Sequence, residues 1–104
     1  MNTESCDYQI FIGLGKSKIK SYFLKRRYIP KITDLCKRNK LGFTVMEAFG
    51  GFEGKDSYSA EYSLVILIAD IEEQEMRTFT TCVRDTLNQE TVLFRKVNAQ
   101  TEFL

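Results

Sequence analysis

The sequence predicts an α+β protein of the ferredoxin-like type, in which a four-stranded antiparallel sheet carries two helices on one face. Four segments have the apolar patterns of strands, and two others carry apolar residues at helical spacing. Their order is strand, helix, strand, strand, helix, strand, which is the βαββαβ pattern. At 104 residues the chain has room for one core, so we expect one domain over 8–104 after a flexible N-terminal stretch at 1–7.

The strands are expected at residues 8–14, 43–49, 62–69 and 89–97, with a short tail strand at 98–104. The first two alternate as half-buried strands do. The third is apolar on both faces from Leu64 onward, which is typical of a central strand covered on both sides. Since the helices cover one face, the open face is expected to meet another copy of the protein, giving a dimer or a trimer.

The first helix is expected to follow Gly15 and to end near Asn39 to Gly42. Its apolar residues are spaced as a single buried stripe: Ile19, Tyr22, Phe23, Ile29, Ile32 and Leu35. Pro30 removes a backbone donor inside this segment, so the helix should kink or restart there.

The second helix is expected to begin with a capping box formed by Asp70 and Glu73, and to run to about Asn88. Its buried face is expected to consist of Met76, Phe79, Val83 and Leu87. Cys82 lies beside this face, and we interpret it as a small core residue rather than a reactive thiol.

The connection between the second and third strands is longer than a plain hairpin requires and is rich in glycine. Gly50, Gly51 and Gly54 allow unusual backbone angles, while Lys55, Asp56 and Ser57 make its tip polar. Long glycine loops often bind ligands or partners, although a flexible connector with a bulge is the alternative.

Charge is distributed unevenly along the chain, although the formal net charge is only +1. Ten of the fifteen basic residues lie between positions 16 and 40, where Asp34 is the sole acid. Residues 70–75 hold four acids and no base. This asymmetry indicates either an anionic ligand or subunits that pair basic against acidic surfaces.

Composition excludes several kinds of site. The chain has no histidine, so neither histidine-assisted nucleophilic catalysis nor an ordinary zinc site is expected within one subunit. Three widely spaced cysteines argue for reduced thiols rather than a disulfide framework. Neither a membrane span nor a secretion signal is recognisable, so we expect a cytoplasmic protein with no cofactor and no membrane partner.

Residues 13–17, GLGKS, invite comparison with a phosphate-binding P-loop because they end a strand and precede a helix. The full motif requires another glycine where Ile10 stands. Two interpretations remain: a glycine turn that opens a helix, or a simpler phosphate site formed by the amides of Gly15, Lys16 and Ser17.

Nucleic acid binding and catalysis have less support from the residues. Base stacking on the sheet would need exposed aromatic residues, and only Tyr8 and Tyr62 have a suitable place. The acids in or beside the loop could form a carboxylate pair: Glu47, Glu53, Asp56 and Glu61. Glu47 shares a strand face with apolar residues, so it is expected either to have a partner at an interface or to lie exposed.

Residues 42–54, GFTVMEAFGGFEG, together with the apolar strand that follows, resemble the corresponding part of nitrogen-regulatory PII-like proteins. The resemblance implies a trimer with inward-facing sheets and a nucleotide or other small anion bound in clefts between subunits. The glycine and aromatic spacing at 50–54, residues 89–93 and Phe103 are also similar to an uncharacterised bacterial family of small α+β proteins.

The leading hypothesis is therefore a non-enzymatic, homo-oligomeric binding or regulatory protein that engages an anionic small molecule, such as a nucleotide, or a partner protein. Its expected ligand-binding residues are Gly15, Lys16, Ser17, Lys25, Arg26, Arg27, Glu47, Gly50, Gly51, Glu53, Gly54 and Lys55. One alternative is a small dimeric α+β-barrel enzyme that uses loop carboxylates. Another is a phage-type inhibitor whose basic helix covers or mimics a nucleic-acid-binding surface.

Overall fold

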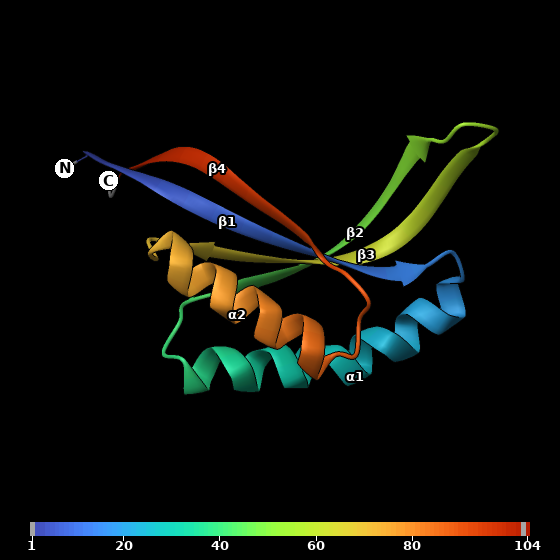
Figure 1. Cartoon of the computed structure of the whole chain (residues 1–104), viewed down its shortest axis with the longest axis horizontal. Coiled ribbons are helices and arrows are strands. Elements are labelled where there is room, and N and C mark those ends of the chain that lie inside the picture. The colour runs from blue at the N-terminus through green and yellow to red at the C-terminus, as the bar shows by residue number, and fades with distance from the viewer. Residues whose placement is uncertain (1, 103) are drawn as a thin grey trace.

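The computed structural model describes residues 2–102 and 104 and confirms the predicted fold class (Figure 1). Both helices lie on one side of a four-stranded sheet, and the other face of the sheet is open. The elements are β1 (Asn2–Gly15), α1 (Lys18–Arg38), β2 (Thr44–Glu53), β3 (Tyr58–Ala69), α2 (Glu73–Thr86) and β4 (Leu93–Glu102). No helix in the described part of the chain is both long and apolar enough to cross a membrane.

The strands follow the order β2-β3-β1-β4, and all neighbours are antiparallel. Strand β1 begins at Asn2 rather than Tyr8, because its first residues pair with the end of β4, as Cys6 does with Asn98. The stretch at 1–7 that we expected to be flexible is thus part of β1 from Asn2 onward. Strand β4 begins at Leu93, later than expected, and includes most of the predicted tail strand; Phe103 lies outside the described residues.

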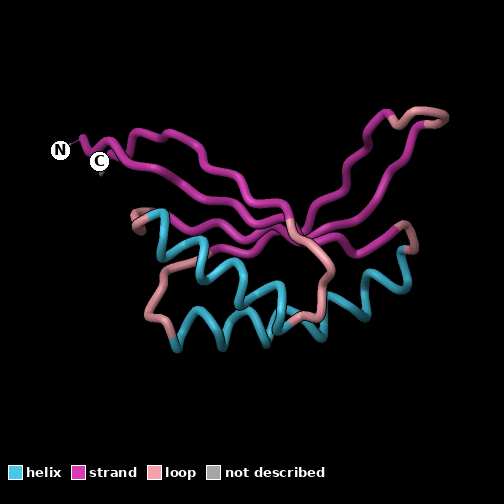
Figure 2. Tube along the Cα trace, in the orientation of Figure 1, coloured by secondary structure: helices cyan, strands magenta, loops and turns pink. Residues whose placement is uncertain are grey.

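Strands β2 and β3 continue together beyond the body of the protein and form a projecting arm, defined as residues 50–61 (Figure 2). The predicted glycine loop is therefore mostly strand. Strand β2 extends to Glu53 and β3 begins at Tyr58, which leaves only residues 54–57 as the connection. The Gly54 N–H donates to the Ser57 carbonyl at 2.8 Å and closes this turn.

The core lies between the helices and one face of the sheet. Ile10 pairs with Ile66, Ile12 pairs with Leu64, and all four side chains are fully buried. The predicted buried face of α2 is confirmed, because all four of its residues are buried: Met76, Phe79, Val83 and Leu87.

Helix α1 buries only part of the predicted stripe, in which Ile32 and Leu35 are buried as expected. Its buried residues are Ser21, Tyr28, Ile32, Leu35 and Cys36. Ile19, Tyr22 and Phe23 are 70%, 49% and 59% exposed, so their predicted burial is wrong. The physical reason is that the first turns of α1 lie beneath the arm, where β2 and β3 curve away from the helix (Figure 1).

Pro30 lies within a continuous α1, so the predicted restart of the helix is wrong. The axis changes direction about midway along the helix (Figure 2), in keeping with the alternative of a kink at an internal proline. At its start, Ser17 is the N-cap, and its hydroxyl accepts from the Lys20 N–H at 3.2 Å.

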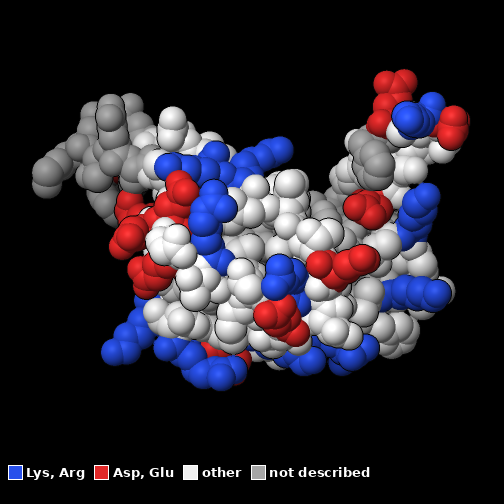
Figure 3. Space-filling model, viewed as in Figure 1, with Lys and Arg blue, Asp and Glu red and all other residues white. Residues whose placement is uncertain are grey.

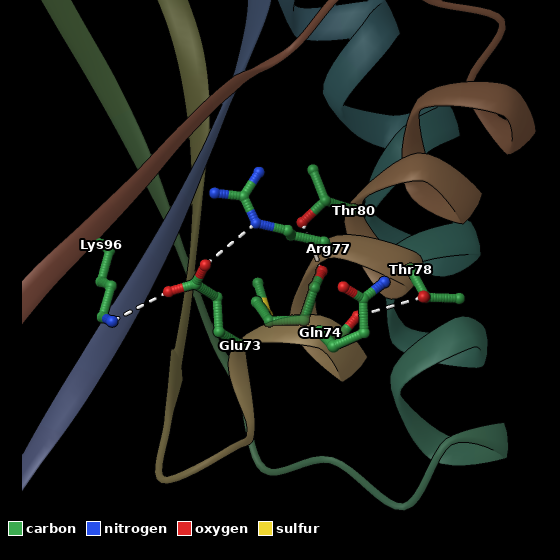
Figure 4. Close-up of polar contacts among 7 residues, drawn as sticks. Glu73, Gln74, Arg77, Thr78, Thr80 and Lys96 are labelled. Atoms are coloured by element: carbon green, nitrogen blue, oxygen red, sulfur yellow. Dashed lines mark hydrogen bonds and ion pairs between the residues drawn. The ribbon is translucent and has the colours of Figure 1, made fainter.

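The predicted capping box at the start of α2 is wrong. Asp70 has a φ of 55° and belongs to the preceding turn, and the N-cap is Glu72. Glu73 instead accepts hydrogen bonds from Lys96 Nζ at 2.8 Å and Arg77 Nε at 3.1 Å (Figure 4). These contacts join α2 to β4, and the Lys96 and Arg77 hydrogen bonds hold the pKa of Glu73 below its usual value.

A lowered pKa in the folded state gives a stabilisation that is present above the ordinary Glu pKa of 4.5 and lost as the pH falls through the folded-state value. We expect Glu73→Gln to lower the melting temperature at pH 7, and the difference from the wild type to vanish once the pH falls below the folded-state pKa of Glu73. Thermal denaturation followed by circular dichroism tests this. Glu75→Gln, in the same helical turn, is the control; an equal loss in both variants would contradict a role for the Lys96 contact.

The cysteines differ from expectation, because Cys82 is exposed and is not part of the core. It lies about 100° around the helix from Val83, which places it beside the buried face rather than within it. Cys36 is the buried cysteine, and burial raises the pKa of its thiol to about 11.

We expect Ellman's reagent at pH 8 to label Cys82 rapidly in the folded protein, and Cys36 only after unfolding. The absorbance of the released thiolate reports both phases. Cys82→Ser should remove one equivalent of rapid labelling, whereas the half-buried Cys6 contributes equally in both proteins. Rapid labelling of Cys36 in the folded state would contradict its burial.

Candidate functional site

Two adjoining hollows lie between α1 and the edge of the sheet formed by β2, with volumes of about 310 and 280 Å³. Tyr22, Lys25 and Glu47 line both, so the two form one groove around these residues. We call it the helix groove and define it by Lys18, Tyr22, Lys25, Arg26, Glu47, Phe49 and Tyr62.

An ion pair crosses the helix groove. Lys25 Nζ on α1 lies 3.0 Å from Glu47 Oε2 on β2. The Lys25 side chain is only 19% exposed, whereas that of Glu47 is 64% exposed. Of the two expectations for Glu47, exposure is the one that the structure shows, and its ion-pair partner belongs to the same chain rather than to an interface.

Aromatic side chains form the walls of the helix groove. The rings of Phe49 and Tyr62 lie with their centroids 4.9 Å apart. The Tyr22 hydroxyl accepts from Arg26 at 3.2 Å, and the guanidinium lies 5.7 Å from the ring centroid. The groove therefore combines aromatic surface with cations.

The predicted charge asymmetry appears on the surface. Basic side chains lie along the lower edge of the molecule, where α1 runs, and acidic ones gather at the end where α2 begins (Figure 3). Lys25 and Arg26 line the helix groove, whereas Arg27 is exposed and does not line it.

Residues 15–17 form the turn that opens α1. Gly15 has a φ of 86°, which favours glycine, and the Ser17 hydroxyl is occupied by capping the helix. The Lys16 ammonium lies 3.5 Å from the Ser59 hydroxyl at the base of the arm.

The predicted site residues on the arm do not line the helix groove. Gly50, Gly51 and Glu53 belong to the projecting part of β2, while Gly54 and Lys55 lie at its tip (Figure 1). Gly51 has a specific steric role, because the Tyr58 ring lies where a side chain at this position would be.

A third hollow, of about 360 Å³, lies on the open face of the sheet beside the α2–β4 connection. We call it the sheet hollow, and it is lined by Phe11, Gly13, Glu61, Ser63, Gln89, Thr91 and Leu93. The sequence indicated only Glu61 here, as one of four acids, because the other lining residues are distant in sequence and carry no motif.

Glu61 is the one acid in the sheet hollow, and it is half-buried. It lies over Gly13, where an added Cβ would meet its carboxylate at 3.8 Å. Among the ion pairs of the described residues, none involves Glu61. Gln89 donates to the Tyr28 hydroxyl at 3.1 Å and holds the rim of the hollow against α1.

Neither a metal site nor base stacking on Tyr8 is supported by residues 2–102 and 104. No group of three potential ligands among them is placed to hold a metal ion. Tyr8 is 2% exposed and faces the helices, so it offers no surface for stacking a base.

No protein-family model and no curated protein matches the chain. Several solved structures do share its fold. A phage SAM lyase in complex with S-methyl-5'-thioadenosine aligns with a TM-score of 0.60 at 17% identity, covering 90% of this chain and 81% of the lyase. CutA1 from Pyrococcus horikoshii OT3, with the mutation D60A, aligns with a TM-score of 0.59 at 4% identity, covering 90% and 82%.

CPII, a nitrogen-regulatory PII-like protein from Thiomonas intermedia K12 bound to ADP, AMP and bicarbonate, aligns with a TM-score of 0.56 at 13% identity. The alignment covers 100% of this chain and 99% of CPII. At these identities the comparisons show the fold, and they support the loose resemblance to PII-like proteins that residues 42–54 suggested.

Proposed function

We propose that this protein is a homo-oligomeric binding protein that packs its open sheet face against other copies and holds an adenosine-containing molecule in the sheet hollow. The observation that carries the proposal is the open sheet face, which holds a cluster of apolar side chains beside polar ones such as Gln9 and Arg95 and has the sheet hollow at one end. No catalytic step is part of this proposal.

The apolar surface of the open face supports association. Register places Phe11, Met46, Val65, Leu67 and Leu93 together on this face. Met46 and Leu93 are 45% and 54% exposed. Contiguous apolar surface of this kind marks interaction sites, and a β3 that is apolar on both sides is typical of a strand covered on both.

The sheet hollow suits a nucleoside. Its volume of about 360 Å³ falls within the range of small-molecule sites. Phe11 and Leu93 offer apolar contact to a base, while the Glu61 carboxylate is placed to accept hydrogen bonds from ribose hydroxyls or an exocyclic amine. Two of the similar structures, the phage lyase and CPII, contain molecules built on adenosine.

The arm is the part of the molecule proposed to engage a partner protein. It projects away from the body, and Tyr58 on it is 71% exposed. Glu53 and Lys55 lie near its tip and present both signs of charge. In a regulatory protein, binding at the sheet hollow would alter contacts made by this arm, since Glu61 lies at its base.

Sedimentation and thermal denaturation test the proposal. The protein is expected to sediment as a dimer or trimer and to melt at a higher temperature with AMP, ADP or S-methyl-5'-thioadenosine than with guanosine. A ligand at 100 times its Kd stabilises by about 2.7 kcal/mol. Glu61→Gln should reduce the thermal shift and Glu75→Gln should leave it unchanged; a monomer indifferent to all these compounds would overturn the proposal.

A second candidate function is an enzyme that cleaves an adenosine-containing substrate with Glu61 as its acid or base. The half-buried carboxylate, which has no ion-pair partner among the described residues, favours it, and one of the similar structures is a SAM lyase. Incubation with SAM, followed by chromatography for S-methyl-5'-thioadenosine, tests this candidate. Product formation that Glu61→Gln abolishes would support the enzyme, and intact SAM would exclude this reaction.

A further inference from the structure

We propose that the helix groove is a second ligand site, which binds a small planar aromatic anion through Lys25. The groove lies between α1 and β2, on the helix-covered side of the sheet, whereas the sheet hollow lies on the open face. The two sites are therefore separate, and this proposal does not depend on the nucleoside proposal.

The shape of the groove suits a flat ring. Two hollows of about 310 and 280 Å³ meet at Tyr22, Lys25 and Glu47, so a ligand can extend from one into the other. Phe49 and Tyr62 pack against each other on one wall, and Tyr22 on α1 lines both hollows. A ring between these side chains would make stacked or edge-to-face contacts.

Charge identifies the polar part of the ligand as an anion. Lys18, Lys25 and Arg26 line the groove, and Glu47 is the sole acid among its lining residues. The cations therefore outnumber the acids there by two. A carboxylate or phosphate would find complementary charge, whereas a cationic ligand would meet three like charges.

The two partners of the Lys25–Glu47 pair differ in exposure, and this difference indicates which of them a bound anion would replace. Lys25 is 19% exposed and depends on an anionic neighbour within the groove, whereas Glu47 is 64% exposed and can point to solvent without leaving a buried charge. A bound anion would thus take the place of the Glu47 carboxylate beside the Lys25 ammonium. Glu47 and the ligand compete for the same cation.

Competition predicts opposite effects for the two partners of the ion pair. Glu47→Gln removes the competitor and should tighten anion binding by up to about fivefold, the upper end of the range measured for exposed ion pairs. Lys25→Met keeps the length of the side chain but removes its charge, and should weaken binding about tenfold. A purely structural role for the pair would move both affinities in the same direction.

The test uses phenyl phosphate, with inorganic phosphate and benzyl alcohol as probes of charge and ring alone. Titration of ¹⁵N-labelled protein should give saturable amide shifts around residues 18–29 and 47–49 with phenyl phosphate, and weaker binding with either control probe. Lys31→Met, an exposed charge removal on the same helix, should bind like the wild type. Melting curves confirm that each variant is folded.

Two results would overturn the proposal: shifts that do not saturate or that map away from the groove, and unchanged affinity in both Glu47→Gln and Lys25→Met. Glu61→Gln separates the two proposed sites. It should leave phenyl phosphate binding intact, and Lys25→Met should leave any thermal shift by AMP intact. Loss of both kinds of binding in either variant would contradict the separation of the sites.

Discussion

Ile66→Ala is expected to lower the free energy of unfolding by about 2 to 5 kcal/mol, the range for removing a large aliphatic side chain from a core. Ile66 is 0% exposed on the central strand β3, and its Cα partner Ile10 is equally buried. Truncation removes buried methyl groups and leaves a cavity. The two paired strands and the helices packed against them cannot readily fill it. Urea denaturation at one fixed protein concentration measures the loss.

Ile19→Ala is the matched control, because it makes the same chemical change at a residue that is 70% exposed. Its effect should lie within about 0.5 kcal/mol of zero, as for most surface substitutions. Equal losses at Ile19 and Ile66 would show that Ile19 is packed in the core. That result would agree with the apolar spacing of the sequence and contradict the structure.

The comparison of these two isoleucines also shows how far the sequence predicts the fold. Alternation and helical spacing are local properties, so the order of the elements and the buried face of α2 followed from them. The burial of Ile19, Tyr22 and Phe23 depends on where the sheet ends above α1, and no local pattern carries that information. The same spacing describes both a buried stripe and an exposed one.

The length of the arm was misjudged for a related reason. Glycines at 50, 51 and 54 indicated a loop, because glycine weakens a strand. In the structure β2 runs through Gly50 and Gly51, and Tyr58 from the opposite strand covers Gly51. The contact is between strands, so it depends on a register that the sequence does not state.

The sequence also predicted one candidate site better than the other. Lys25, Arg26 and Glu47 were predicted from charge and from strand alternation, and the structure brings them together in the helix groove. Tyr22 was predicted as part of the buried stripe of α1 and not as a site residue. The residues of the sheet hollow come from β1, β3 and the α2–β4 connection. They are far apart in the sequence, so the sequence alone does not predict that they line one hollow.

Met46→Glu combined with Leu93→Glu is expected to convert the proposed oligomer into a monomer and to lower its association constant by at least about 100-fold. Each apolar side chain buried at an interface contributes about 1.5 to 3 kcal/mol, and a buried unpaired carboxylate adds a further cost. Within one chain both residues are about half exposed, so the fold of the subunit should tolerate the change. Sedimentation equilibrium measures the association constant, and circular dichroism confirms the fold.

Phe23→Glu is the control for this double variant. Phe23 is 59% exposed, comparable with Met46 and Leu93, but it lies on α1, away from the open face. If the open face is the interface, Phe23→Glu should leave the association constant unchanged. If α1 carried the interface instead, the control would dissociate and the double variant would not, which would transfer the interface from the open sheet face to the basic helix.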